Sequence, residues 1–257
     1  MEEEIEENIG GREKIQHLQT VGHGLSSVVR YNQKREGLGI LNQSVAEHKF
    51  NMLLIKDVFK DRINEQHDVD WDKVDKMVRY HDVGELVEGD IICVNKTDAD
   101  RELERLHEYD VVSDFPTELG DEIIDLLREK EELESIEARI THVLDKLEPE
   151  ILIATERGIK EIKDLHREQG IGIEEYAFKK FNHLLKVLKE WELDCLIETV
   201  EELWERQVEL GILKDDPQLV IETEEGKELE EEGADQKREI EIEIEEEKET
   251  EKEREML

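Results

Sequence analysis

Apolar residues recur at steps of three and four over most of this 257-residue chain. Val45, Met52, Ile55 and Phe59 form one such stripe, and this spacing places their side chains on one face of an α-helix. Further stripes lie within residues 15–28, 74–78, 136–151 and 178–210. No segment before residue 225 shows a convincing strand pattern. The sequence therefore predicts an all-α domain of about seven or eight helices.

Capping and breaking residues mark the expected ends of these helices. Asp70 and Thr117 are expected to start helices, because Asp and Thr side chains accept hydrogen bonds from free backbone N–H groups. The glycines expected to separate helices are Gly37, Gly39, Gly120, Gly158, Gly170 and Gly172. Pro149 lies within a stripe, where it either kinks one helix or, as we slightly favour, begins a new helix capped by Glu148.

The C-terminal segment differs in composition from the rest. Residues 225–257 contain 16 acidic and 6 basic residues and few large apolar side chains. Such a segment cannot bury enough apolar surface to offset the entropy lost on ordering. Ile240, Ile242 and Ile244 alternate with glutamates, but an isolated strand would lack a partner. We expect residues 1–224 to form the helical domain and residues 225–257 to form an acidic tail, disordered or marginally helical.

The charge balance limits the partners of this chain. It has 72 acidic and 35 basic residues, a formal net charge of -37. Stable nucleic-acid binding normally requires clusters of Lys and Arg, so this balance argues against it. There is no apolar run of about 18 residues and the chain starts Met-Glu-Glu-Glu, so we expect no membrane span, no signal peptide and a cytoplasmic location. Cys93 and Cys195 are far apart and are expected to be ordinary buried thiols.

His81 and Asp82 are polar residues at the end of an apolar stripe. His81 follows Val78 by three residues and Val74 by seven, so its side chain belongs to the same face. A buried histidine and aspartate are costly to desolvate without a partner, and a divalent metal would be one. Glu85 shares this face and could act on a water bound by that metal. The alternative, favoured by the dipeptide alone, is a surface pair or a helix C-terminal cap.

His48 and Asp145 extend this set. His48 lies on the buried stripe of its own helix, although a lone histidine there is more often a hydrogen-bonded core residue. Asp145 lies next to the apolar stripe of residues 136–151. Together with His81 and Asp82, these residues offer two imidazoles and two carboxylates. This set of nitrogen and oxygen donors suits Mn, Fe, Co, Zn or Mg better than a soft metal.

Five short segments resemble, in order, the motifs of the HD-domain metal-dependent phosphohydrolases. They are SVAEH (44–48), HDVGE (81–85), GDI (89–91), EA (137–138) and DKLE (145–148). Within that superfamily the chain is most similar to the 5'-deoxynucleotidase branch, which carries an upstream arginine at the place of Arg30. Glu85 is followed by Leu86, whereas the ppGpp-hydrolase branch usually has an aspartate there.

The resemblance implies an HD-domain helical bundle with one divalent metal ion, Mn, Co, Fe, Zn or Mg. The implied ligands are His48, His81, Asp82 and Asp145. A water would attack the phosphorus of a nucleoside 5'-phosphate, and the metal would lower the pKa of that water and neutralise phosphate charge.

The resemblance also implies the other site residues. Glu85 would orient or deprotonate the water, and Asp90 would act as proton donor or contact the sugar. Arg30 would hold the phosphate or the sugar. Tyr31 stands where bacterial relatives carry a tryptophan against the sugar, which makes it a candidate substrate contact. We add Lys96 as a candidate second phosphate contact, the alternative being an ordinary surface lysine.

The expected activity is removal of the 5'-phosphate from nucleoside monophosphates, in particular deoxynucleotides. Two alternatives are a dNTP triphosphohydrolase of the same superfamily and a non-catalytic acidic helical scaffold. The expected partners are the nucleotide and, by the resemblance, a second copy in a homodimer. Residues 184–204 could complete the core or form a dimer surface. His142, one turn before Asp145, is the remaining histidine with a possible supporting role at the site.

Overall fold

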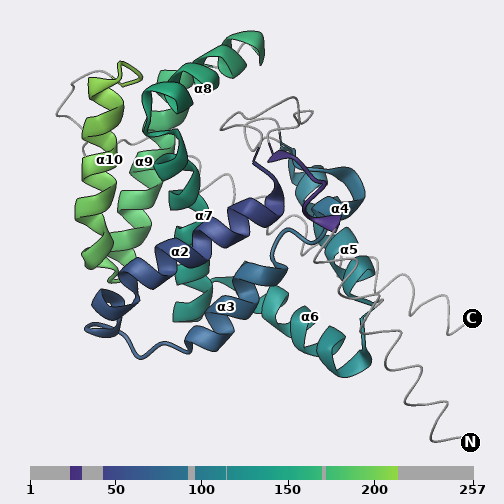
Figure 1. The fold of residues 1–257 in the computed structure, drawn as a ribbon. Coiled ribbons are helices and arrows are strands. Elements are labelled where there is room, and N and C mark those ends of the chain that lie inside the picture. The colour runs from purple at the N-terminus through teal and green to yellow at the C-terminus, as the bar shows by residue number, and fades with distance from the viewer. Residues whose placement is uncertain (1–23, 31–42, 92–95, 114, 170–171, 214–257) are drawn as a thin grey trace, which may run out of the picture. The chain divides into compact units, whose positions relative to one another are not determined.

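The structure is a computed structural model that describes residues 24–30, 43–91, 96–113, 115–169 and 172–213 (Figure 1). Its helices are α2 (Val45–Asn64), α3 (Trp71–Tyr80), α4 (Glu85–Glu88), α5 (Asp98–Ser113), α6 (Thr117–Glu132), α7 (Ile136–Ile153), α8 (Glu156–Gln169), α9 (Ile173–Glu190) and α10 (Ile197–Glu209), with a 3-10 turn η5 (Asp194–Leu196). Within these ranges the only β pairing is an isolated antiparallel bridge between Val29 and Ser44. The all-α prediction is confirmed: eight described helices have ten or more residues, and α4 is a single turn.

Side-chain caps fix where α2, α3 and α7 begin, and the cap of α7 is the Ser135 hydroxyl, which accepts a hydrogen bond from the Ala138 N–H. The Ser44 hydroxyl accepts a hydrogen bond from the Glu47 N–H, and the Glu47 carboxylate accepts one from the Ser44 N–H, which forms a capping box at the start of α2. The Asp70 side chain caps α3, as expected. Thr117 is the first residue of α6, and Pro116 precedes it without a side-chain cap.

Two of the glycines expected to separate helices lie inside helices, so that expectation was wrong for them. Gly120 is in α6 and Gly158 is in α8. A Cβ at Gly120 would lie 3.2 Å from the Val112 carbonyl oxygen, and one at Gly158 would lie 2.7 Å from backbone atoms of Ile153. Both positions therefore need glycine for close backbone packing. Gly172 does precede α9, while Gly37, Gly39 and Gly170 lie outside the described residues.

Pro149 lies inside α7, so the favoured expectation that it begins a new helix was wrong. Its ring nitrogen has no hydrogen to donate to the Asp145 carbonyl four residues earlier. Leu147 and Ile153 are buried before and after the proline. Burial of apolar side chains on both sides keeps α7 continuous despite this lost hydrogen bond.

Residues 25–28, the end of the stripe predicted for residues 15–28, are not helical. Gly24 is in a π-helical turn, residues 25–27 form a turn, Val29 makes the bridge and Arg30 is in a 3-10 turn, while the residues before 24 lie outside the described ranges. The Val28 carbonyl accepts a hydrogen bond from the Val45 N–H, and the Arg30 N–H donates to Gln43. Backbone pairing with the segment that leads into α2 replaces helical hydrogen bonds here.

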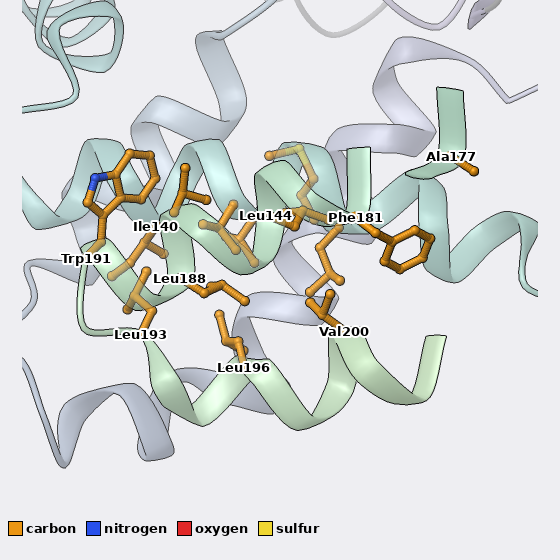
Figure 2. Close-up of a cluster of buried hydrophobic side chains, with 14 of the residues drawn as sticks. Ile140, Leu144, Ala177, Phe181, Leu188, Trp191, Leu193, Leu196 and Val200 are labelled. Atoms are coloured by element: carbon orange, nitrogen blue, oxygen red, sulfur yellow. The ribbon is translucent and has the colours of Figure 1, made fainter. Parts of the chain in front are cut away.

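Helix α7 is the centre of the larger apolar core. It packs against α2, α3, α6, α8, α9 and α10 (Figure 1). Figure 2 shows Ile140 and Leu144 of α7 in one cluster with Phe181, Leu188 and Val200. The other buried residues of this region include Leu184, Val187, Trp191 and Leu196. The segment from residue 184 to residue 200 therefore completes the core.

A second, smaller apolar cluster lies where α5 and α6 meet the end of α3. Its buried members are Leu25, Val45, Tyr80, Val83, Val112, Phe115, Ile123 and Leu127. Helix α2 contributes Val45 to this cluster and Met52 to the larger core. The chain after α3 likewise passes from Val78 of the larger core to Val83 of the smaller cluster. Both segments therefore cross the boundary between the two clusters.

Several composition-based predictions can be compared with the structure. None of the helices in the described ranges combines the length and apolar character needed to cross a membrane. Cys195 is a free, half-buried thiol, and Cys93 lies outside these ranges. The predicted tail of residues 225–257 lies outside them too, so the division at residue 224 stays a prediction.

Candidate metal centre

Four residues from three parts of the chain converge between the two apolar clusters. His48 is in α2, His81 and Asp82 directly follow α3, and Asp145 is in α7. Each offers one ligand atom, and these atoms lie within 4.8 Å of one another. The fold thus brings together the residues that the sequence selected, although 97 positions separate His48 from Asp145.

Both ring nitrogens of the fully buried His48 face carboxylates. Nδ1 lies 2.7 Å from Oε2 of Glu148, and Nε2 lies 3.2 Å from Oδ1 of Asp145. Burial and Arg30 lower the pKa of His48, but hydrogen bonds to Asp145 and Glu148 outweigh them and raise it. A metal at Nε2 would replace the proton shared with Asp145, while Nδ1–H would keep donating to Glu148.

The buried ring of His81 has one nitrogen satisfied and one without a hydrogen bond. Nδ1 donates to the Val78 carbonyl at 2.9 Å, which assigns the proton to Nδ1. Burial lowers the pKa of His81, so the ring is neutral and Nε2 carries a lone pair. Nε2 lies 3.0 Å from Oδ2 of Asp82, yet among the described residues it has no hydrogen-bond partner. Two electron-rich atoms facing each other in a buried site fit a cation between them.

Asp82 and Asp145 supply the two carboxylates. Asp82 has a φ of 59°, in the left-handed region that aspartate tolerates better than most residues, and its side chain faces His81. Burial opposes ionisation of Asp145, but Lys146, whose Nζ lies 2.9 Å from Oδ2, and His48 hold its pKa well below the usual range. The four residues therefore fit a divalent metal with mixed nitrogen and oxygen ligands.

Glu85 lies beside these ligands, where the sequence predicted it. It begins α4 and is 8% exposed. Asp82, Glu85 and Glu104 offer oxygen atoms that lie within 4.8 Å of one another. Burial, followed by the charges of Asp82, Asp90 and Glu104, raises the pKa of Glu85 well above its usual value. A carboxyl group able to hold or release a proton thus adjoins the candidate metal centre.

Asp90 and Lys96 lie near Glu85. Asp90 is partly buried, and its charge acts on Glu85. Lys96 forms an ion pair with Glu104. Burial lowers the pKa of Lys96, but Glu104, Asp82 and Glu85 outweigh this effect and raise it. Lys96 is therefore close to the site and is not an isolated surface lysine. A small hollow in this region is lined by Gly84, Glu85, Gly89, Ile91, Asp100, Glu104 and His107.

Arg30 lies on the Nδ1 side of His48. Its Nη1 donates to Oε2 of Glu148 at 3.1 Å and to Oε1 of Gln43 at 3.2 Å, and it lies 3.0 Å from Nδ1 of His48. Arg30 thus takes part in holding His48, and its expected contact with phosphate stays a prediction. Tyr31, the other expected substrate contact, lies outside the described residues.

Glu148 supports the metal centre in a way that the sequence analysis missed. Its side chain is almost fully buried. The side chains that donate hydrogen bonds to it are Arg30, Gln43, His48 and Asn51. Glu148 follows Asp145 by three positions, so it shares a face of α7 with a ligand, and that spacing was the available signal. No comparable signal pointed to Gln43, Asn51 or Glu104.

His142, which the sequence left as a possible support for Asp145, has a different partner. Its Nε2 lies 3.2 Å from Nε2 of His183 in α9. Among the described residues, no hydrogen bond joins His142 to any of the four candidate ligands. His142 therefore belongs to a separate pair of histidines.

Comparison with known families identifies the fold that holds this centre. The sequence pattern of the HD domain family matches residues 27–184. This match spans more than half of the chain and includes all four candidate ligands. The chain belongs to the HD domain family. His81 and Asp82, which directly follow α3, thus lie within the HD domain.

Two solved structures share this HD domain fold. A predicted metal-dependent phosphohydrolase from Magnetospirillum magnetotacticum is 21% identical, with 79% of this chain and 98% of that chain covered and a TM-score of 0.58. A conserved hypothetical protein from Pyrococcus furiosus is 20% identical, with coverage of 74% and 99% and a TM-score of 0.54. At these identities the likeness shows the fold. Comparison with curated proteins finds no match.

Proposed function

We propose that this HD domain protein is a metal-dependent phosphohydrolase that removes the 5'-phosphate from nucleoside monophosphates, in particular deoxynucleotides. The observation that carries the proposal is the convergence of His48, His81, Asp82 and Asp145 beside the buried carboxyl of Glu85. The nucleotide is proposed from the order of motifs that resembles the 5'-deoxynucleotidase branch.

The side chains around the centre have distinct roles in this proposal. A divalent ion held by the four ligands would supply Lewis acidity and lower the pKa of a water. Glu85, next to Asp82, would orient that water and take its proton in the ionised form. Lys96 adds positive charge to the same region, which would attract a phosphate. Asp90 would serve as proton donor or sugar contact, and Arg30 would contact phosphate while holding His48.

The first test is Asp82→Ala. We expect this change to remove about one equivalent of bound metal and to lower phosphate release to background, because it removes a buried ligand. Elemental analysis and phosphate assays on dNMPs, NMPs and dNTPs, with Mn, Co, Mg or Zn added to stripped protein, would measure both effects. Asp72→Ala, an exposed aspartate of α3, is the matched control.

Each outcome of this test favours a different assignment of ligands or function. Unchanged metal content in Asp82→Ala would show that the ligand assignment is wrong. Triphosphate released from dNTPs, without phosphate from monophosphates, would favour the triphosphohydrolase alternative. Metal binding without any product would favour a non-catalytic role such as the acidic scaffold.

A further inference from the structure

The pair formed by His142 of α7 and His183 of α9 lies apart from the four ligands. The two Nε2 atoms lie 3.2 Å apart, and the ring planes are inclined by 73° with their centroids 5.5 Å apart. His183 is exposed and His142 is half-buried, so the pair can be reached from solvent. Two imidazole nitrogens thus converge at an accessible point between adjacent helices.

We propose that His142 and His183 form a second, exposed binding site for a transition-metal dication that prefers nitrogen ligands, such as Cu²⁺, Ni²⁺ or Zn²⁺. Two nitrogens bound tetrahedrally to Zn²⁺, each about 2.0–2.1 Å from the ion, are about 3.3 Å apart. The observed separation of 3.2 Å matches this value. The centroid separation of 5.5 Å shows that the two nitrogens face each other nearly in line, so each ring would tilt to direct its lone pair at a shared metal. This inference does not depend on the proposed phosphohydrolase activity.

The surroundings restrain the His142 ring and the two helices that carry the pair. Trp191 packs edge-on against His142, with ring centroids 5.6 Å apart, and the Arg139 guanidinium lies 5.7 Å from the centroid of the Trp191 ring. Beneath the pair, α7 and α9 are joined through the core, in which Leu144 and Leu184 are buried. The packed helices keep the two histidines close together before a metal binds, and this preorganisation favours affinity.

The protonation state of the pair favours metal binding, whereas the nearby lysines oppose it. Burial, followed by Lys146, lowers the pKa of His142 to about 4, and burial, Lys146 and Lys186 lower the pKa of His183. Both rings are therefore neutral near pH 7, the form that binds metals. The same lysines repel a dication, whereas Asp145 and Glu190 attract it. Lys146 is itself paired with Asp145, which reduces its repulsion.

The donor atoms select the class of metal. Imidazole nitrogen suits Cu²⁺, Ni²⁺ and Zn²⁺, whereas Mg²⁺, Ca²⁺ and Mn²⁺ prefer oxygen ligands. Affinity for a given nitrogen site rises to a maximum at Cu²⁺. The candidate metal centre differs in that it adds the carboxylates of Asp82 and Asp145. Copper is therefore the most sensitive probe of the histidine pair.

Copper titration of the full-length protein tests this site. We expect His183→Ala to lose about one equivalent of bound Cu²⁺, together with the two-nitrogen coupling pattern of that copper in electron paramagnetic resonance. The matched control is His67→Ala, because His67 contacts the backbone carbonyl of Glu192 and, within the described ranges, no second histidine. Asp82→Ala should lose a different equivalent, at the buried centre, and should keep the surface copper.

The result that would overturn the proposal is equal copper binding and an unchanged spectrum in His183→Ala and the unmodified protein. The contact would then be only an N–H···N hydrogen bond between neutral imidazoles. His183→Asn is a second variant that keeps a polar, exposed side chain at this position. Circular dichroism of both variants would show that loss of copper is not loss of fold.

Discussion

Glu148 shows how much of this metal centre depends on a residue that is not a ligand. Its carboxylate accepts hydrogen bonds from Gln43 at 2.6 Å and from Asn51 at 3.0 Å, besides those from Arg30 and His48. Glu148 accepts a hydrogen bond from Nδ1–H of His48. It thereby fixes the tautomer in which the lone pair of Nε2 is available to a metal. A carboxylate behind a histidine also raises the basicity of the ring and so its affinity for a metal.

Replacing Glu148 by Gln should weaken metal binding by roughly 10–100-fold, because the amide is a weaker acceptor and competes with the donors around it. Competition with a chelator of known affinity would measure the dissociation constant. Glu150→Gln is the matched control: Glu150 is in the same helix, is also buried and pairs with Lys180 and Gln207, but does not contact the ligands. Equal affinities in the two variants would contradict the assigned role of Glu148.

At the scale of elements, the junction between α4 and α5 places Glu85 next to the ligands. The chain leaves α3 at His81, turns at Asp82 and begins α4 at Glu85. An added Cβ at Gly84 would lie 2.5 Å from the Glu104 carbonyl oxygen of α5. The absence of a side chain at Gly84 is therefore what allows α4 to approach α5 so closely.

Gly84→Ala should lower the free energy of unfolding by about 1–3 kcal/mol, and Gly84→Ser by more, because each added atom displaces the α5 backbone. Gly89 offers the contrast. Its φ is 83° and no described residue would lie within 4 Å of an added Cβ, so Gly89→Ala and Gly89→Ser should cost similar amounts through backbone strain. Thermal and chemical denaturation of the four variants would measure this. Equal costs for Ala and Ser at Gly84 would argue against steric contact as the cause.

For the whole molecule, the main electrostatic feature is a group of buried charges within a very acidic protein. Glu108 of α5 is 6% exposed, and Lys49 of α2 is buried with its Nζ donating to the Arg79 carbonyl. Burial lowers the pKa of Lys49 to about 8. Burial also raises the pKa of Glu108 to about 7, with Lys130 opposing this shift and Asp82 adding to it. Global stability should therefore respond to pH near neutrality.

Glu108→Gln should stabilise the protein above pH 7 and should have little effect below about pH 4.5. Between pH 4.5 and 7 the folded protein keeps a proton on Glu108 that the unfolded chain has released, so the free energy of unfolding falls as pH rises. The full difference above pH 7 is roughly 3 kcal/mol by this shift. Denaturant titrations of chelator-treated protein across pH 4 to 8 would measure it. Glu102→Gln, on the exposed face of α5, controls for loss of one negative charge.

The sequence predicted the helices and the ligand types because both leave a local pattern. Because a helix has 3.6 residues per turn, the side chains on its buried face recur every three or four residues. Helices α2, α3 and α7 were therefore predictable from their apolar stripes. The same reasoning failed at Gly120, Gly158 and Pro149. At these positions packing against other parts of the fold outweighs the local preference of the residue to end a helix.

By itself, the sequence determined an all-α HD domain with His48, His81, Asp82 and Asp145 as candidate ligands. Only the tertiary structure decided the partners of these residues: Glu148 holds His48, Lys96 pairs with Glu104, and His142 faces His183. Hydrogen bonds and ligand sets require atoms within about 3 Å of one another. That proximity depends on how helices cross, and spacing along the chain does not encode the crossing of segments 100 residues apart, such as those of His48 and Glu148.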